Sequence, residues 1–341
     1  MGFSNPPVPW NELEARLSNG RAPSSASWNG GGDGPALGAK RQPFEPAVER
    51  RHGDVPYAEL HCRSNFSFLH GASHPEQLAE CAAALGLGAL ALTDRNGLYG
   101  VVRFAEAARA VGLPTVFGTE IGCGGFEGAG GGDLVLLARG PAGYARMARA
   151  ISEGQLAGSK NEPVFLLGDV ARTVRGHCLV LTGGRDGAVV RAFEDDGPAA
   201  AQRTLAQMVC AFGAENVLVE LWDHGDPVDA IRNDHFVRMA VELDLQCVAT
   251  NNVSYAVPAQ HRLATAFAAV NQRAALDDVD HRLSPAATAY LRSGAEQERR
   301  FARYPGTVAN AARIGAELAF DLSLVAPSLP PFPCPDGLTE M

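Results

Sequence analysis

Cysteine, basic charge and long apolar runs are all scarce in this sequence. The seven cysteines are odd in number and never form a C-x-x-C pair, so we expect neither a disulfide framework nor a structural zinc site. Lys and Arg (29) are fewer than Asp and Glu (38), and the formal net charge of −9 argues against a bulk electrostatic footprint for nucleic acid. No apolar run approaches the ~18 residues of a membrane span, and no signal peptide opens the chain. We therefore expect a cytoplasmic protein with no membrane partner.

The composition is that of a globular protein. A chain of 341 residues, 46% hydrophobic and 20% charged, allows one large or two ordinary domains. Residues 1–53 differ from the rest, because positions 19–38 are rich in Gly, Ser, Asn and Pro and have little to bury. We expect a flexible lead-in there.

Short apolar runs alternate with helical patterns over residues 54–258. The expected strands lie at 57–61, 89–93, 115–117, 134–138, 178–181, 217–221 and 247–250, with helices between most of them. Strands separated by helices indicate βα units and a parallel sheet. At least seven such strands favour a closed or nearly closed barrel, so we expect the α/β class and a distorted (β/α)7 barrel.

The strands stop after residue 258. Residues 260–270, 295–302 and 307–320 have helical patterns, so 259–326 is expected to be a helical segment. Residues 327–341 carry five prolines and resemble a linker into something further on. We expect the sequence to be a fragment of a longer protein.

Polar residues follow the expected strands. In a parallel α/β barrel, chemistry is found at the carboxyl ends of the strands. Such residues follow five of the expected strands, and three of them are candidate metal ligands: His61, Asp94 and Glu120.

Four segments resemble the motifs of the PHP (polymerase and histidinol phosphatase) superfamily. They are residues 59–67 (ELHCRSNFS), 91–100 (ALTDRNGLYG), 117–120 (FGTE) and 248–255 (VATNNVSY). The resemblance implies a PHP-type barrel whose active members hold a trinuclear zinc, manganese or iron cluster. Such a cluster lowers the pKa of a bridging water and clamps a phosphate ester.

Further segments narrow the resemblance to bacterial C-family DNA polymerase α subunits (DNA polymerase III alpha type). They are residues 134–139 (LVLLAR), 181–187 (LTGGRDG) and 219–225 (VELWDHG). Residues 5–10 (NPPVPW) and 329–333 (LPPFP) are similar to the actinobacterial error-prone branch, which serves damage-induced synthesis. The resemblance implies a parent nucleotidyltransferase that uses Mg²⁺. Its polymerase core and its DNA contacts would lie beyond Met341.

The sequence departs from the PHP pattern at most ligand positions. Arg63 and Arg95 stand where the family has His, Asp133 replaces another His, and Gly184 replaces a Cys. Asn252 and Ser254 replace the Asp and His of the last motif, and His224 is a candidate pocket residue. The predicted vestigial site is therefore His61, Arg63, Asp94, Arg95, Glu120, Asp133, Gly184, His224, Asn252 and Ser254.

Two arginines at ligand positions should repel divalent ions, because an Arg keeps its proton and cannot ligate. We expect them to pair with Asp94 and Glu120 instead. The prediction is a site without catalytic residues and without metal, in a domain that supports the polymerase core and is inactive alone. If the site does hold metal, His61, Asp94 and Glu120 are the ligands.

Two other functions remain open. One is a PHP phosphoesterase or 3′–5′ exonuclease that uses Zn²⁺ or Mn²⁺, supported by the three retained ligands. The other is an interaction module for mutagenesis proteins or the sliding clamp, for which the sequence offers no peptide motif. Two further patterns have plain interpretations. The Gly-rich stretch 124–132 is expected to be a surface loop, and the arginines at 299, 300 and 303 a solvated helix face.

Overall fold

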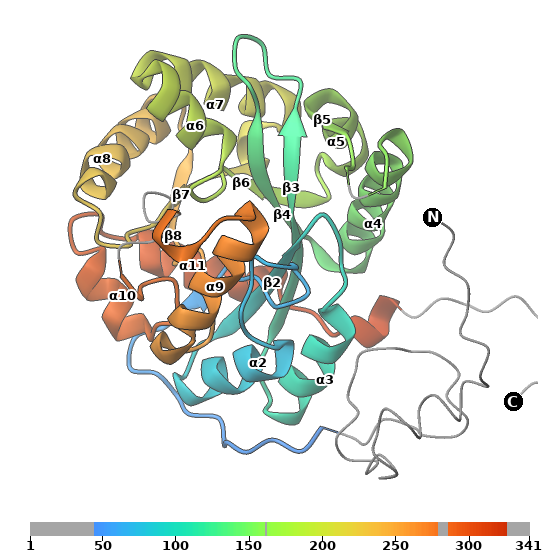
Figure 1. The fold of residues 1–341 in the computed structure, drawn as a ribbon, viewed down its shortest axis with the longest axis vertical. Helices are drawn as coiled ribbons and strands as arrows, with labels where there is room; N and C mark the ends of the chain where they lie inside the picture. Colours follow the sequence, from blue (N-terminus) through green and yellow to red (C-terminus); the bar gives the residue numbers. More distant parts are fainter. Residues whose placement is uncertain (1–43, 161, 279–285, 326–341) are drawn as a thin grey trace, which may run out of the picture. The chain divides into compact units, whose positions relative to one another are not determined.

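Seven strands follow one another across a single sheet in the same order as along the chain. The computed structural model describes residues 44–160, 162–278 and 286–325 (Figure 1). The strands are β1 (Ala58–Glu59), β2 (Ala89–Arg95), β3 (Thr115–Gly124), β4 (Gly132–Ala138), β6 (Cys178–Leu181), β7 (Val217–Leu221) and β8 (Gln246–Ala249). A short extra strand, β5 (Phe165–Leu166), pairs with the end of β3.

The first and last strands meet just beyond their carboxyl ends. Cys62 and Val253 form a parallel bridge, in which the Arg63 amide donates to the Val253 carbonyl (2.9 Å) and the Val253 amide to the His61 carbonyl (2.8 Å). The sheet is thus closed at one end, as the predicted distorted seven-stranded barrel requires.

The expectation of an all-parallel sheet is wrong at β4. This strand runs antiparallel to both β3 and β6. The physical reason is the length of the β3–β4 connection, residues 125–131, since a parallel return needs about a dozen residues or more. Gly128 and Gly131 have positive φ angles of 70° and 79° in this loop, so the Gly-rich stretch serves a tight turn.

The strands are apolar because both faces of the sheet are covered. All seven residues of β4 and all five of β7 are buried, which accounts for strands made mostly of Val and Leu with no regular alternation of apolar and polar residues. Helices lie around the sheet in Figure 1. They are α2 (Pro75–Ala84), α3 (Val101–Ala110), α4 (Gly140–Ala157), α5 (Leu167–Val174), α6 (Ala188–Asp196), α7 (Pro198–Phe212) and α8 (Pro227–Glu242).

Within the described residues, three more helices follow the barrel: α9 (His261–Gln272), α10 (Gly294–Arg300) and α11 (Thr307–Leu318). Helix α11 packs against β1 and β8, where Gly315 lets its backbone approach the Ala58 side chain. Asn310 also donates to the Cys247 carbonyl (3.0 Å). The helical segment therefore covers the seam at which the first and last strands meet.

Short 3-10 turns complete the described chain: η1 (Ala214–Asn216), η2 (Pro258–Gln260), η3 (Leu276–Asp278) and η5 (Leu322–Val325). None of the helices in the described ranges is long and apolar enough to cross a membrane. Of the expected lead-in at 1–53, residues 1–43 lie outside the described residues, and residues 44–53 form no helix or strand. The Pro-rich stretch at 327–341 also lies outside the described residues.

Candidate functional site

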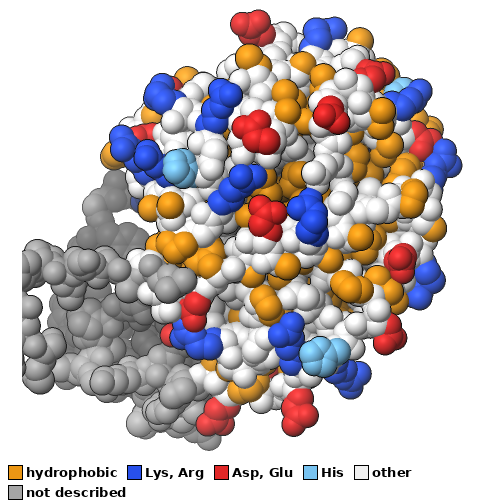
Figure 2. Space-filling model, turned by 180° about the vertical axis from the view of Figure 1, so that it is seen from behind, with side chains coloured by type: hydrophobic (Ala, Val, Ile, Leu, Met, Phe, Trp, Pro, Cys, Tyr) orange, Lys and Arg blue, Asp and Glu red, His pale blue; other side chains and the backbone are white. Residues whose placement is uncertain are grey.

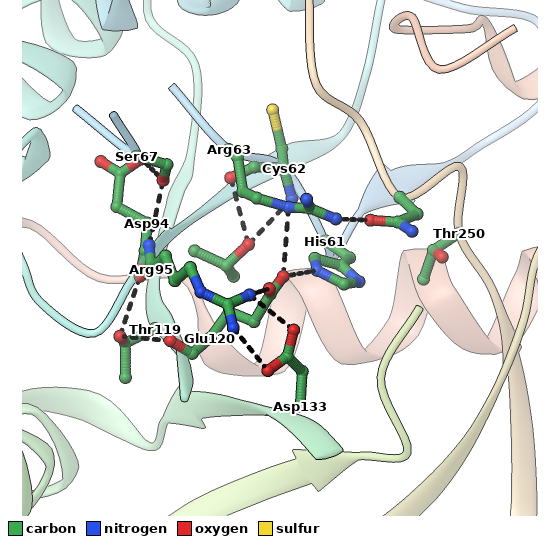
Figure 3. A network of polar contacts seen from close by, with 12 residues as sticks. His61, Cys62, Arg63, Ser67, Asp94, Arg95, Thr119, Glu120, Asp133 and Thr250 are labelled. Atoms are coloured by element: carbon green, nitrogen blue, oxygen red, sulfur yellow. Dashed lines mark hydrogen bonds and ion pairs between the residues drawn. The ribbon is translucent and has the colours of Figure 1, made fainter. Parts of the chain in front are cut away.

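Charged side chains from five strands converge at the end of the barrel where the sheet closes. His61 and Arg63 follow β1, Arg95 ends β2, and Glu120 and Glu220 lie in β3 and β7. The reversed strand β4 contributes Asp133 from its amino-terminal end, because its direction is opposite. Six charged groups thus form one network, of which Figure 3 shows the central part.

Glu120 lies at the centre of this network. Its Oε2 accepts from His61 Nε2 at 2.8 Å and lies 3.1 Å from Arg63 Nε, and its Oε1 accepts from Arg95 Nη1 at 2.8 Å. Burial alone would raise the pKa of this carboxyl, but Arg63, His61 and Arg95 hold it well below its usual value. Glu120 is therefore a buried carboxylate bound by three cations.

His61 is held between two carboxylates. Its Nε2 faces Glu120 and its Nδ1 faces Glu220 Oε1, both at 2.8 Å. Since a carboxylate only accepts, both ring nitrogens must donate, and the ring is an imidazolium. Burial lowers the pKa of His61, but the charges of Glu220 and Glu120 outweigh it and raise that pKa to about 9.

Arg95 joins Glu120 to Asp133. Its Nη1 and Nη2 donate to the two Asp133 oxygens at 2.6 and 2.9 Å. The register of the sheet brings these residues together, because Arg95 in β2 lies opposite Glu120 in β3, and Asp133 in β4 lies opposite Gly122 in β3. Burial and Glu120 raise the pKa of Asp133 to about 6, which leaves it ionised at neutral pH.

Asn252 and Gly184 position the second arginine. The Asn252 Oδ1 atom accepts from Arg63 Nη2, and Asn252 has a left-handed backbone (φ 44°). The Asn252 amide lies where a side chain at 184 would be, since a Cβ there would meet its Nδ2 at 2.0 Å. The two departures from the PHP pattern at 184 and 252 are thus physically linked.

Among the described residues, Asp94 forms no ion pair with an arginine, contrary to our expectation. Its Oδ1 accepts from the Ser64 amide (2.8 Å), and its carboxylate also accepts from the Ser64 and Ser67 hydroxyls. Asp94 and Arg95 are neighbours in β2, so their side chains point to opposite sides of the strand. Asp94 fixes the loop after β1, whereas Arg95 takes Asp133 as its second partner.

The remaining predicted residues lie beside the network. His224 is buried, and its Nε2 lies 2.8 Å from the Asn251 carbonyl. Its pKa is lowered by burial to about 4. Ser254 connects to the loop after β1 through its carbonyl, which accepts from the Ala72 amide at 2.7 Å. Neither side chain contacts Glu120 in the described interactions, so neither is part of the central network.

Two glutamates in the barrel interior were not predicted as site residues from the sequence. Glu220 accepts from the Thr250 hydroxyl at 2.5 Å in addition to His61. Glu59 accepts from the Tyr57 hydroxyl and the His61 and Asn251 amides, and burial raises its pKa to about 7. The signal that could have found them is a lone acidic residue inside an otherwise apolar strand.

These residues do not fit a metal cluster. A metal-bound His must present an unprotonated nitrogen, and both nitrogens of His61 are directed at carboxylates. Two guanidinium groups occupy the space between the acidic groups. Within residues 44–160, 162–278 and 286–325, no three His, Cys, Asp or Glu side chains are arranged to hold a metal ion.

Comparison with known proteins identifies the class to which this barrel belongs. Residues 59–224 match the PHP domain family, so the chain carries a PHP domain. The whole chain is also homologous to actinobacterial error-prone DNA polymerases. It is 44% identical over 348 residues to the error-prone DNA polymerase of Mycolicibacterium paratuberculosis, and 44% identical over 350 residues to that of Cutibacterium acnes.

Both alignments cover 100% of this chain but only 32% and 31% of those proteins. The chain thus spans about a third of the length of the curated relatives that it matches. Among solved structures, an amidohydrolase from Chromobacterium violaceum is similar with a TM-score of 0.42 and 18% identity. That similarity covers 58% of this chain and 88% of the other.

Proposed function

We propose that this chain is the metal-free PHP scaffold of an error-prone DNA polymerase, in which an ion-pair network replaces the catalytic cluster. The observation that carries the proposal is the state of His61, whose two ring nitrogens are both bonded to carboxylates. A histidine in that state stabilises the barrel end and cannot ligate a metal ion.

The charges of the network balance. His61, Arg63 and Arg95 supply three positive charges, and Glu120, Asp133 and Glu220 supply three negative ones. A divalent ion would add uncompensated positive charge to a buried site, which is strongly unfavourable. The vestigial site residues therefore support the closed end of the barrel instead of a reaction.

The proposed partner is a polymerase core in the same longer polypeptide. Templated DNA synthesis with Mg²⁺, in repair or translesion replication in the cytoplasm, would belong to that core. The described arginines near α10 have acidic partners within the chain, since the part-buried Arg300 pairs with Asp223 and the exposed Arg303 with Asp234. Figure 2 likewise shows basic and acidic side chains interspersed over one face.

A phosphoesterase or exonuclease is the alternative, and the three retained ligand types favour it. The arrangement of these three residues in the structure counts against this alternative. Asp94 contacts Ser64 and Ser67, whereas His61 and Glu120 contact each other and the cations around them.

A pair of assays tests the proposal. The purified chain is given a generic phosphomonoester and single-stranded DNA with Mn²⁺ or Zn²⁺, and we expect no turnover. Turnover that His61→Ala abolishes would establish the hydrolase and overturn the scaffold. A chimera in which this chain replaces the matching third of the M. paratuberculosis polymerase should synthesise DNA. A chimera that folds and synthesises none would also contradict the proposal.

A further inference from the structure

The chain leaves the barrel along a defined path after helix α11. This helix ends at Leu318, and Ala319 has extended backbone angles (φ −66°, ψ 129°). The next residues reach the amino-terminal end of β3, which is the opposite end of the barrel from the charged network. Figure 1 shows this red stretch continuing from α11 to the short turn η5, which lies against α4. We call residues 319–323 the exit strap.

Two reciprocal hydrogen bonds join the exit strap to the first residue of β3. The Phe320 amide donates to the Thr115 carbonyl at 3.1 Å, and the Thr115 hydroxyl donates to the Phe320 carbonyl at 2.9 Å. On the β2 side, Leu90 donates to the Pro114 carbonyl, so the Thr115 carbonyl points to the other side of β3. The ladder with β4 begins only at Gly118. The exit strap therefore supplies the partner that a buried backbone carbonyl at this position needs.

The Phe320 ring adds to an aromatic cluster in the barrel wall. It lies edge-on to the Phe117 ring, with the ring centroids 5.1 Å apart and the ring planes at 67°. Phe117 is fully buried and makes similar edge contacts with Phe104 of α3 and Tyr144 of α4, at 6.2 and 6.1 Å. Edge-to-face pairs of this kind add to the energy gained by burial alone. The exit strap thus contacts the same core residue that packs against two barrel helices.

Asp321 connects the exit strap to the turn that follows it. Its Oδ1 accepts from Arg109 Nη2 at 2.6 Å and from the Ser323 amide at 2.8 Å. The ion pair is exposed, so it contributes little to stability. It nevertheless links the end of α3 to the first turn of η5, and this link fixes the direction of the chain beyond Phe320.

We propose that the exit strap orients the polymerase core relative to the barrel, because it fixes both the point and the direction in which the polypeptide leaves. The inference rests on the proposed function, which places such a core in the same longer polypeptide. The surface that receives the exit strap is the amino-terminal end of β3, with Thr115 and Phe117. The sequence predicts a linker directly after the strap, at residues 327–341. A released strap would therefore leave the core attached but free to move relative to the barrel.

Hydrogen exchange on the full chain tests whether the exit strap is held. The peptide that covers residues 319–323 should exchange slowly in the unsubstituted protein, because the Phe320 and Ser323 amides are hydrogen-bonded. Phe320→Ala and Thr115→Val should each speed its exchange by at least ~5-fold without changing the exchange of residues 118–124. Thr115→Val keeps the shape of the side chain and removes only the hydroxyl, so it decides the test if Phe320→Ala does not fold.

Phe267→Ala is the matched control. Phe267 is also a half-buried phenylalanine that lies after the barrel, but it packs against Tyr255 and Ala289 and not against the partners of the exit strap. Its removal should leave the exchange of residues 319–323 unchanged.

The orienting role is tested in the chimera with the M. paratuberculosis polymerase, by electron paramagnetic resonance between two spin labels. One label is attached to the exposed Cys210 of α7, and the other to a cysteine introduced on the surface of the polymerase core. The unsubstituted chimera and Phe267→Ala should give one narrow distance distribution. Phe320→Ala and Thr115→Val should broaden it, and DNA synthesis should fall in the same two variants.

The outcomes separate the two proposals. If the unsubstituted chimera folds and synthesises no DNA, the proposed function fails. If it synthesises DNA but residues 319–323 exchange as fast as an unfolded peptide, or neither strap variant folds, the inference about the exit strap fails alone. A narrow distance distribution that persists in both strap variants would also overturn it.

Discussion

Glu120→Gln removes the negative charge that three cations share. Gln keeps the volume but replaces one acceptor oxygen with an amide donor, which faces positively charged groups. The side chains of His61 and Glu120 are 0% and 3% exposed, so most of this interaction is screened little by water. Arg95 is 27% exposed, which lets its charge find partial compensation in solvent.

Breaking a buried ion pair by removing one partner costs about 3–5 kcal/mol. Because His61, Arg63 and Arg95 all lose the same partner, we expect a destabilisation at the upper end of that range. In domains of about 150–250 residues, this corresponds to a fall of roughly 6–20 °C in the unfolding temperature.

Thermal and urea unfolding measure this loss, with Glu317→Gln as the matched control. Glu317 pairs with Arg313 in an exposed pair on α11, at side-chain exposures of 50% and 52%. Its loss should cost about 0–1 kcal/mol. If Glu120→Gln changes the stability no more than Glu317→Gln does, the network does not support the barrel and the reasoning is wrong.

Three further predictions use other parts of the site. First, the His61 ring should carry protons on both nitrogens at pH 7.5 in ¹⁵N NMR spectra, because its pKa is raised to about 9; a neutral ring at that pH contradicts the assignment. Since the folded pKa exceeds the ordinary 6.5, this histidine's contribution to stability is complete below about pH 6.5. It should be lost as pH rises through about 9, and His61→Ala should flatten that part of the curve. Second, Gly184→Ala should destabilise the protein by about 1–3 kcal/mol, because the new side chain clashes with the Asn252 amide. Adding Asn252→Gly should recover part of this loss. If unfolding experiments show that the effects of the two substitutions are strictly additive, positions 184 and 252 do not interact. Third, the chain alone should not extend a primed DNA template with Mg²⁺, and extension by the purified chain would refute the placement of catalysis elsewhere.

Most strand positions could be predicted from the sequence, for a clear physical reason. Runs such as residues 178–181 and 217–221 coincide with β6 and β7, because strands covered on both faces are apolar over most of their length. Helices α5 and α6 did not stand out, since they are only eight and nine residues long. Helical periodicity is read over windows of about 11–18 residues, and both helices are too short to fill such a window.

The direction of β4 relative to its neighbours could not be predicted from the apolar residues of the strand. A buried parallel strand and a buried antiparallel strand have the same composition, so only the short connection at 125–131 held the information. That reversal has a consequence for the site. It places Asp133 at the same end of the barrel as Glu120 and Arg95.

The site residues could be located from motifs, but their partners could not. The motif resemblance brought out His61, Arg63, Arg95 and Glu120, which the structure does bring together. The partner of Arg95 depends on which side of β2 its side chain leaves and on which residues of β3 and β4 lie beside it. Both are properties of sheet register, which emerges only when the strands are paired.

Elemental analysis of the purified chain, prepared without chelators, tests the central claim most directly. The balanced network of His61, Arg63 and Arg95 with Glu120, Asp133 and Glu220 predicts a chain without stoichiometric zinc, manganese or iron, whose unfolding temperature does not change when EDTA is added. Two or more of these ions per chain, with a stability that EDTA lowers, would show that the site is a working PHP metal centre and would contradict the account.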